Sequence, residues 1–390
     1  MSDQIIQNEN PSADRNVLRI MTTIVGTLFS VCLIAVFCYN FVLSSGTKEA
    51  VSQQKTADVT IMDKYDMYVT NAIADALNGV LSVEIQKVYW LSDHDQVAPE
   101  PNPAGYGEVN SFEELKPILK KAEQLLGGQK LAFTPDRPVW NGDTIHYYYD
   151  ETILVVAWKE IVNNSVYTVA EVKVAHPSQF RRFLAGGEFG SDKQFKTTEM
   201  AQSVNAVLAS SGDFYGYRKY GVVAYEGELR RFEGESVDTC YITEKGDLLF
   251  TYRNELKTEE EARKFIEDND VRFSLAFGPV LLDDGEIMVP QDYILGEVNG
   301  TFSRGAICQW DDLHYLVVNT SQEQGYIKRH KVRDFAKFIQ ELGCKTAYAL
   351  DGGQTTAIVM DDELVTLPDY KTQRRISDII YFATALPDGG

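Results

Sequence analysis

The uncharged apolar segment from Ile20 to Leu43 constrains this chain of 390 residues more than any other feature. A helix of that length, rising about 1.5 Å per residue, crosses about 30 Å of hydrocarbon. Arg15 and Arg19 precede the segment and Lys48 follows it, so the excess of positive charge places the N-terminus in the cytoplasm. We therefore expect a single transmembrane helix at 20–43, a cytoplasmic tail at 1–19, and the rest of the chain outside the cell membrane.

A cleaved signal peptide is the alternative interpretation of this segment. Signal peptides usually have a shorter apolar region, followed by a small-x-small cleavage site. The residues Ser44-Ser45-Gly46 are small, but the apolar stretch is long, which favours an uncleaved anchor. Either interpretation places the residues after about 46 in an extracytoplasmic compartment.

The balance of charge limits the possible partners. The formal net charge is −20 and the pI is about 4.7. Nucleic acids and anionic lipid headgroups need a basic surface, so neither is an expected partner. Solubility alone also accounts for an acidic balance.

Three cysteines follow the apolar segment: Cys240, Cys308 and Cys344. The number is odd, and no CxxC spacing or zinc pattern is present. We expect these thiols to be buried as small apolar groups.

The remainder of the chain predicts an α+β architecture in two regions. A polar linker at 44–60 leads to a membrane-proximal α+β region at 61–164, and a C-terminal domain with a mixed sheet follows at 165–386. Helical patterns cover 61–81, 112–126, 259–268 and 330–342, with Ser111 as the N-cap of the second. Strand patterns dominate from Ile145 to Val174.

A turn near the C-terminus has the composition of a reactive site. An apolar strand ends at Leu350 and runs into Asp351, and two glycines and three small polar residues follow: Gly352, Gly353, Gln354, Thr355 and Thr356. A carboxylate fixed at a strand end beside open backbone N–H groups suits acid–base chemistry on a sugar or phosphoester. The alternative is an ordinary Asp-Gly hairpin turn.

Six segments, in order over about residues 165–385, resemble the phosphodiester glycosidase family, whose bacterial members are often labelled exopolysaccharide biosynthesis proteins. They are 167–174 (YTVAEVKV), 211–216 (SGDFYG), 277–285 (FGPVLLDDG), 303–307 (SRGAI), 350–356 (LDGGQTT) and 375–381 (RISDIIY). The chain departs from the family pattern at four positions: Ser211 for Asn, Gly305 for Thr, Asn319 for Asp and Ala349 for Asn.

The resemblance implies roles for particular residues. Asp351 and Asp213 are the expected catalytic carboxylates, and Arg304 is the expected contact for phosphate. Each has a plainer alternative: a turn, a turn cap or a surface salt bridge. Asp378 is expected at the site, orienting Arg304 or Arg375. The remaining residues implied in substrate binding are Ser211, Gly212, Tyr215 and the N–H donors of Gly352, Gly353, Gln354, Thr355 and Thr356.

Together with the apolar segment at 20–43, the resemblance implies a membrane-anchored bacterial hydrolase that cleaves sugar-1-phosphodiester linkages in envelope or exopolysaccharide glycans. The expected partners are a glycan or sugar-phosphate substrate and the membrane. No cofactor is indicated, and a divalent metal stays open. The four departures favour a second hypothesis, in which the domain binds or assembles glycan without catalysis. A third makes 61–164 a partner-binding module.

Overall fold

The computed structural model describes residues 91–92, 96–139, 144–213, 215–234, 236–289, 301–321 and 331–386. The transmembrane helix predicted at 20–43, the linker at 44–60 and the helix at 61–81 lie outside these residues. Within the part of the chain that the structure describes, no helix combines the length and apolar character needed to cross a bilayer. Lys87–Gly390 forms one compact unit.

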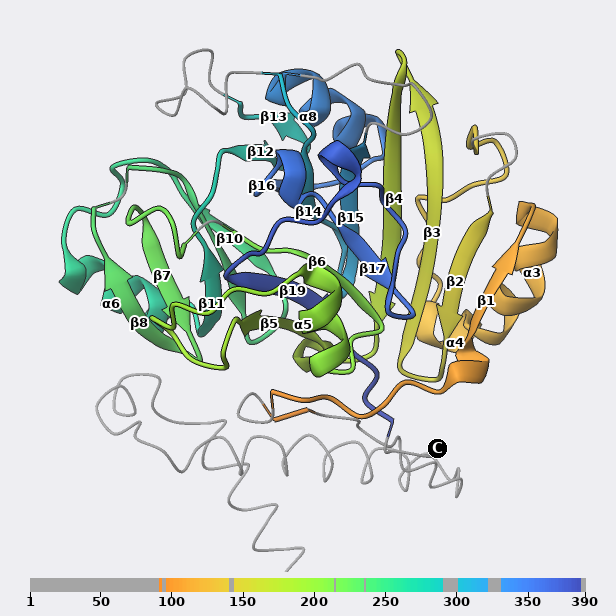
Figure 1. Ribbon diagram of the computed structural model, residues 1–390, viewed down its shortest axis with the longest axis horizontal. Coiled ribbons are helices and arrows are strands. Elements are labelled where there is room, and N and C mark those ends of the chain that lie inside the picture. The colour runs from red at the N-terminus through yellow and green to blue at the C-terminus, as the bar shows by residue number, and fades with distance from the viewer. Residues whose placement is uncertain are drawn as a thin grey trace, which may run out of the picture. The chain divides into compact units, whose positions relative to one another are not determined.

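An antiparallel sheet of nine described strands runs from β1 at the right of Figure 1 to β13 at the top. In sheet order these are β1 (Tyr106–Val109), β2 (Ile145–Tyr149), β3 (Ile153–Val162), β4 (Ser165–Val174), β15 (His314–Ser321), β14 (Gly305–Asp311), β16 (Thr346–Leu350), β12 (Val280–Asp283) and β13 (Glu286–Ile287). Every residue of β4 and β15 is buried, as expected for central strands covered on both faces.

Two smaller sheets complete the β structure of the described residues. One has the order β10 (Leu248–Thr251), β9 (Thr239–Thr243), β11 (Val271–Leu275), β7 (Val222–Tyr225) and β8 (Glu228–Phe232). The other has the order β18 (Glu363–Leu364), β17 (Ile358–Met360), β6 (Leu208–Ser211), β19 (Asp378–Phe382) and β5 (Phe180–Leu184).

The three sheets meet at the ring of Phe180. Its centroid lies 4.7 Å from that of Phe382 on β19, 5.0 Å from Tyr315 on β15 and 5.5 Å from Phe273 on β11. Aromatic groups that fill such a junction bury much apolar area, so one continuous core supports all three sheets.

The helices are few and lie outside the sheets. They are α3 (Phe112–Lys121), α4 (Glu123–Leu126), α5 (Thr197–Ser203), α6 (Glu259–Asp268) and α8 (Val332–Glu341), with short 3-10 turns η1 (Pro103–Gly105), η2 (Pro177–Gln179), η4 (Gly353–Thr355) and η5 (Asp369–Lys371). The helices predicted at 112–126, 259–268 and 330–342 are confirmed. Ser111 caps α3 by accepting from the Glu114 amide at 3.3 Å, and Gly343, with φ +87°, follows α8.

The sequence predictions of fold class and thiol burial agree with this structure. The described residues form a mixed α+β fold with mostly sheet and few helices. Cys240, Cys308 and Cys344 are buried and unpaired.

The domain boundary predicted between residues 164 and 165 falls within the β3–β4 hairpin. The turn residues Asn163 and Asn164 have φ values of 50° and 64°, which suit a tight two-residue hairpin. The strands β1 to β3, which precede this boundary, therefore lie in the same sheet as β4 and β12 to β16, which follow it.

Candidate active site

Asp351 lies where β16 ends, against the turn that follows β6. Its main-chain amide donates to the Gly212 carbonyl oxygen at 3.2 Å. The carboxyl oxygen Oδ1 accepts from the Gly352 amide at 2.9 Å. Its second oxygen, Oδ2, is buried and has no hydrogen-bond partner among the described residues. One oxygen thus fixes the carboxyl group, and the other is available for chemistry.

The surroundings of Asp351 change its acidity. Burial raises its pKa to about 6, although the Thr355 hydroxyl, Arg374, the Gly352 amide and Arg218 each lower it in part. The residue is 8% exposed. A carboxyl group that titrates near neutral pH is suited to proton transfer.

The glycines after Asp351 are required by the backbone. A Cβ on Gly352 would lie 2.6 Å from the Ser303 carbonyl oxygen. Gly353 has φ +66° and donates its amide to the same oxygen at 2.8 Å. The two glycines therefore hold the Asp351 turn against the segment that carries Arg304.

The N–H groups predicted to cradle a ligand are largely used within the turn. The Gly352 amide binds Asp351, and those of Thr355 and Thr356 donate to the carbonyl oxygens of Gly352 and Gly353 at 3.4 and 3.3 Å. The hydroxyls of Thr355 and Thr356 donate to the same two carbonyl oxygens, and the Gln354 side chain donates to Thr372 at 2.7 Å. These bonds make the turn rigid and leave little of it for a ligand.

Arg304 lies beside this turn at the start of β14. Its side chain is mostly buried, which lowers its pKa to about 10, and it lies 5.6 Å from the centre of the Phe302 ring. The neighbouring Ser303 hydroxyl donates to the Asp369 carboxylate at 2.5 Å. This bond fixes η5 against the strand that carries Arg304.

Two further arginines near Asp351 were not predicted as site residues. Arg374 and Arg218 both act electrostatically on the Asp351 carboxyl. Arg374 lies 4.7 Å from the Tyr217 ring centre, and Arg218 lies 4.4 Å from that of Phe277. An aromatic ring attracts and orients a guanidinium, and guanidinium groups match the geometry of phosphate. The Arg374-Arg375 pair was visible in the sequence, but nothing in it showed which member faces the site.

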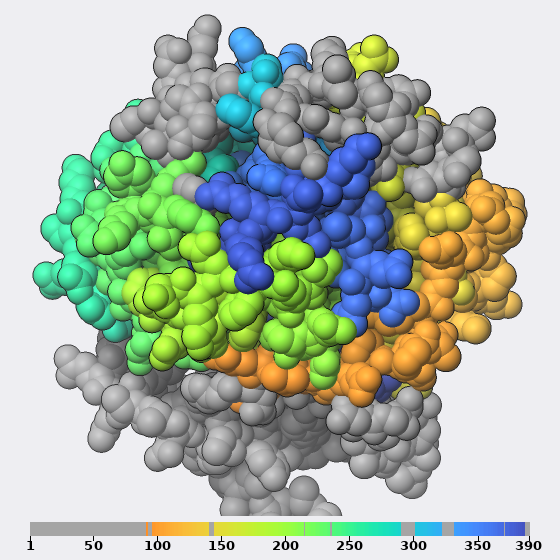
Figure 2. Space-filling model, viewed as in Figure 1, coloured from red at the N-terminus to blue at the C-terminus, as the bar shows by residue number. Residues whose placement is uncertain are grey.

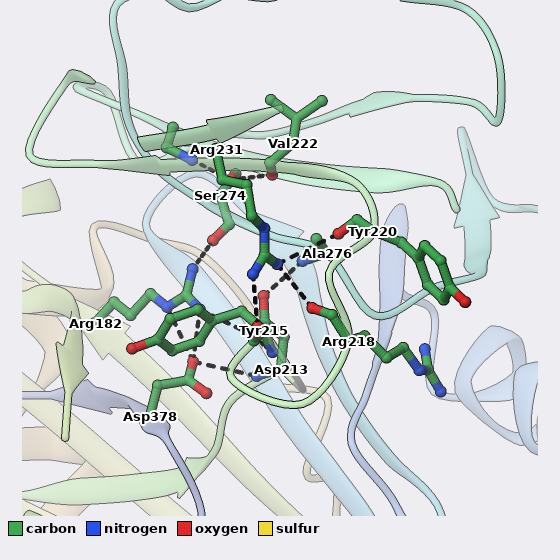
Figure 3. Close-up of polar contacts among 11 residues, drawn as sticks. Arg182, Asp213, Tyr215, Arg218, Tyr220, Val222, Arg231, Ser274, Ala276 and Asp378 are labelled. Atoms are coloured by element: carbon green, nitrogen blue, oxygen red, sulfur yellow. Dashed lines mark hydrogen bonds and ion pairs between the residues drawn. The ribbon is translucent and has the colours of Figure 1, made fainter. Parts of the chain in front are cut away.

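Asp213 is fully committed to a buried ion-pair cluster, shown in Figure 3. Its Oδ1 accepts from Arg182 Nη2 at 2.9 Å and from the Tyr215 amide at 2.8 Å, and its Oδ2 accepts from the Ala276 amide at 2.7 Å. Asp378 Oδ2 accepts from Arg182 Nε, also at 2.9 Å. The partner of Asp378 is thus Arg182 on β5, and not Arg304 or Arg375 as expected.

The cluster also occupies the other predicted residues of the 211–216 turn. The Tyr215 ring is buried and lies 5.2 Å from the Arg182 guanidinium and 5.9 Å from that of Arg231. Burial raises the pKa of Tyr215 to about 12. Gly212 leaves the space filled by the Asp378 carboxylate. Ser211 is buried, and its hydroxyl has no partner among the described residues.

In Figure 3 the Arg218 side chain extends away from Arg182 and Asp378. Arg218 therefore lies in a different polar environment from the ion-pair cluster, although it follows closely in sequence the turn that carries Asp213. The turn carries buried charge pairing on one side and a cation near Asp351 on the other.

Asn319 is a further candidate that the sequence showed only as a departure from the family pattern. It lies on β15, opposite Gly305 on β14 and Thr168 on β4. It is fully buried, and neither atom of its amide has a partner among the described residues.

Among the described residues, no group of His, Cys, Asp or Glu side chains is arranged to hold a metal ion. The dark-blue C-terminal part of the chain meets the green part near the centre of the face seen in Figure 2.

The family model of the phosphodiester glycosidases matches residues 204–383. The family resemblance predicted from the sequence is therefore confirmed for this part of the chain, which carries both the Asp213 and the Asp351 turns. A search of curated proteins finds no match.

Several solved structures resemble the chain, among them two from different organisms. One is the catalytic domain of zebrafish N-acetylglucosamine-1-phosphodiester alpha-N-acetylglucosaminidase, auto-inhibited by its pro-peptide. It is 16% identical, with a TM-score of 0.49, over 64% of this chain and 86% of that chain. The other is a hypothetical protein from Synechocystis, 13% identical, with a TM-score of 0.45, over 62% of this chain and 64% of that chain.

Proposed function

We propose that this chain is a phosphodiester glycosidase that hydrolyses sugar-1-phosphodiester linkages, with Asp351 as its reacting carboxyl. The observation that carries the proposal is the state of this side chain. It is buried, one of its oxygens has no partner among the described residues, and its pKa is about 6 beside Arg374 and Arg218. The family match at 204–383 supplies the reaction class.

The chemistry follows from the leaving group. A phosphate monoester departs as an anion and needs charge stabilisation more than it needs a proton. Water attacks the anomeric carbon, the bond from that carbon to the phosphate oxygen breaks, and its electrons leave with the phosphate. The proton lost by water passes to the ionised Asp351 carboxylate, which acts as the general base.

Arg304, Arg218 and Arg374 are assigned to the phosphate group. Guanidinium groups match phosphate geometry and keep their charge in partly buried positions. The exposed rings of Tyr217 and Phe302 lie beside two of these arginines and offer flat apolar surfaces to a sugar ring.

The cluster around Asp213 has a supporting role in this proposal. Arg182, Asp213 and Asp378 hold the 212–216 turn in place, and this turn accepts the Asp351 amide. Asp213 and Asp378 are then positioning residues, and Asp351 alone carries out the proton transfer.

The proposal includes single-pass anchoring through 20–43, with the domain outside the cytoplasmic membrane and acting on envelope or exopolysaccharide glycans. The uncharged segment and its flanking arginines support it. Protease treatment of intact cells tests the topology, since the domain is digested without lysis only if it lies outside the membrane.

The test of the activity is hydrolysis by the purified full chain, in mild detergent, of a panel of sugar-1-phosphodiesters, with and without divalent metals. We expect release of a phosphomonoester and a reducing sugar, and loss of turnover in Asp351→Asn. Asp284→Asn, at an exposed turn between β12 and β13, is the matched control and keeps wild-type activity. Wild-type rates in Asp351→Asn would refute its assigned role.

One observation favours a second function, glycan binding without turnover. Both oxygens of Asp213 are used in the buried cluster, so the second catalytic carboxylate implied by the family resemblance is not available. Absence of turnover on the whole panel, together with calorimetric binding of a sugar phosphate, would establish this function instead.

A further inference from the structure

A row of neutral polar groups crosses the nine-stranded sheet next to Asp351. Thr168, Asn319 and Gly305 lie opposite one another on the adjacent strands β4, β15 and β14, which run side by side in Figure 1. Residues directly opposed in an antiparallel sheet place their side chains on the same face, about 5 Å apart. Gly305 is also opposite Leu350, the residue before Asp351.

The glycine makes room for the Asn319 amide. A Cβ at position 305 would lie 3.0 Å from Asn319 Oδ1 and 3.3 Å from the main-chain oxygen of Asp351. The Asn319 amide therefore lies over Gly305, close to the main chain of Asp351. A larger side chain at 305 would separate the two.

These polar groups lack partners. Both amide atoms of Asn319, the Thr168 hydroxyl oxygen and Asp351 Oδ2 are buried without a hydrogen bond among the described residues. Burying such groups without partners costs free energy, and stable proteins rarely retain them without a reason. The Asn319 amide lies near the Asp351 main chain, and we take this position to mean that a ligand at the Asp351 site completes the bonding of these groups.

The chemistry of the row identifies the part of the ligand that it fits. A primary amide offers two donors and one acceptor, and the threonine hydroxyl offers both functions, all without charge. Each hydroxyl of a sugar also donates and accepts, so neighbouring ring hydroxyls match an amide. The phosphate, by contrast, fits the charged guanidinium groups of Arg374 and Arg218, which act on the Asp351 carboxyl.

We propose that Asn319 and Thr168 bind ring hydroxyls of the glycosyl group beside Asp351 and determine which sugar the site accepts. This inference rests on the proposed function, because it names the sugar-binding part of that same site. Asn319 and Thr168 are specificity-determining residues here and take no part in proton transfer.

The experiment compares substrates and variants of the full chain together. The substrates are the sugar-1-phosphodiester that the wild type cleaves fastest and its monodeoxy analogues, one for each ring hydroxyl. The variants are Asn319→Leu and Thr168→Val, which keep volume and remove hydrogen bonding. Thr239→Val is the matched control, since Thr239 on β9 is also buried with an unpartnered hydroxyl but lies in another sheet.

We expect one or two deoxy analogues to lose about 10- to 100-fold in wild-type kcat/KM, as an unpaired buried polar group causes. Asn319→Leu should lower kcat/KM for the parent substrate by a similar factor. It should lower kcat/KM for those analogues no further, because the hydroxyl that Asn319 binds is already absent from them and the two losses are not additive. Thr168→Val should behave alike, and Thr239→Val should match the wild type on every substrate.

Two results would overturn the inference. One is wild-type kcat/KM that is equal for all deoxy analogues, a measurement that needs no variant to fold. The other is an equal loss of kcat/KM by Asn319→Leu on the parent substrate and on the analogues, together with a lowered melting temperature. That result would show that the Asn319 amide supports the fold and does not bind the sugar. Turnover without dependence on the sugar hydroxyls refutes this subsite alone, whereas absence of turnover in the wild type refutes the proposed function and this inference together.

Discussion

The main-chain amide of Asp351 donates to the carbonyl oxygen of Gly212 at 3.2 Å. This single bond joins the end of β16, in the nine-stranded sheet, to the turn after β6, in another sheet. The reacting carboxyl proposed here therefore depends on how two sheets are held together. Replacements in the Asp351 turn should change the activity, whereas replacements in the Asp213 turn should lower the free energy of unfolding.

Asp351→Asn should make the protein more stable at neutral pH. A carboxyl whose pKa is raised by folding stabilises the fold below its unfolded pKa, and this contribution is lost as the pH rises through the folded value. The rise from 3.8 to about 6 corresponds to about 3 kcal/mol. Asparagine mimics the protonated form, so the variant should gain up to about this amount at pH 7.5 and little at pH 4.

Urea unfolding of both proteins at the two pH values measures this difference. Asp284→Asn, in an exposed turn, should show no comparable gain at either pH. Equal stability of Asp351→Asn and wild type at pH 7.5 would contradict a raised pKa at this position.

The pH profile of activity should report the ionised form of Asp351. If this carboxylate accepts a proton from water, kcat/KM rises as the pH increases through about 6 and then levels off. Initial rates between pH 4.5 and about 8 measure the profile. A fall in kcat/KM through pH 6 would instead assign Asp351 as a proton donor.

Arg374 and Arg375 provide a matched pair of adjacent arginines. Arg374 acts on the Asp351 carboxyl, whereas Arg375 is 57% exposed and donates to the Gln194 carbonyl oxygen. Arg374→Gln should lower kcat/KM by about 10²- to 10³-fold, as expected for loss of a charged contact in the transition state. It should also move the rise in activity to higher pH, because Arg374 lowers the pKa of Asp351.

Arg375→Gln should leave both the rate and its pH dependence close to wild type. Steady-state kinetics of the two variants at several pH values makes the comparison. Equal effects of the two replacements would contradict a specific role for Arg374 at the Asp351 site.

Asp213→Asn should weaken the fold, in contrast to Asp351→Asn. The change leaves Arg182 wholly buried with only Asp378 as a charged partner, and breaking a buried ion pair costs about 3–5 kcal/mol. Denaturant unfolding at pH 7.5 measures the loss. An Asp213→Asn protein that is as stable as the wild type but inactive would instead support a catalytic role for Asp213.

The parts of the fold that were predictable depend on local chemistry. The α6 and α8 helices follow from apolar periodicity, and Ser111 and Gly343 mark helix ends through capping geometry. The position of Asp351 at a strand end was likewise visible from the apolar run before it and the glycines after it.

The partners of the charged residues were not predictable in the same way. Arg182 lies in a strand with no motif, and its role depends on β5 pairing with β19 in the folded sheet. The burial of Asp213 depends on the Ala276 amide at the end of β11. Such contacts join segments far apart in sequence, so spacing along one chain does not show them. The Asn163-Asn164 turn, by contrast, was a local signal for a hairpin at the predicted boundary.

β19, the last in sequence of the described strands, lies inside its sheet, between β5 and β6. Until Asp378–Phe382 has been synthesised, both neighbours present unpaired edges, and such edges invite pairing with other chains. The same strand carries a carboxylate partner of the buried Arg182. The sheet thus closes, and this buried charge gains its second counter-ion, only after every other described strand of the sheet has been synthesised, which makes the nascent domain dependent on protection until Asp378–Phe382 emerges.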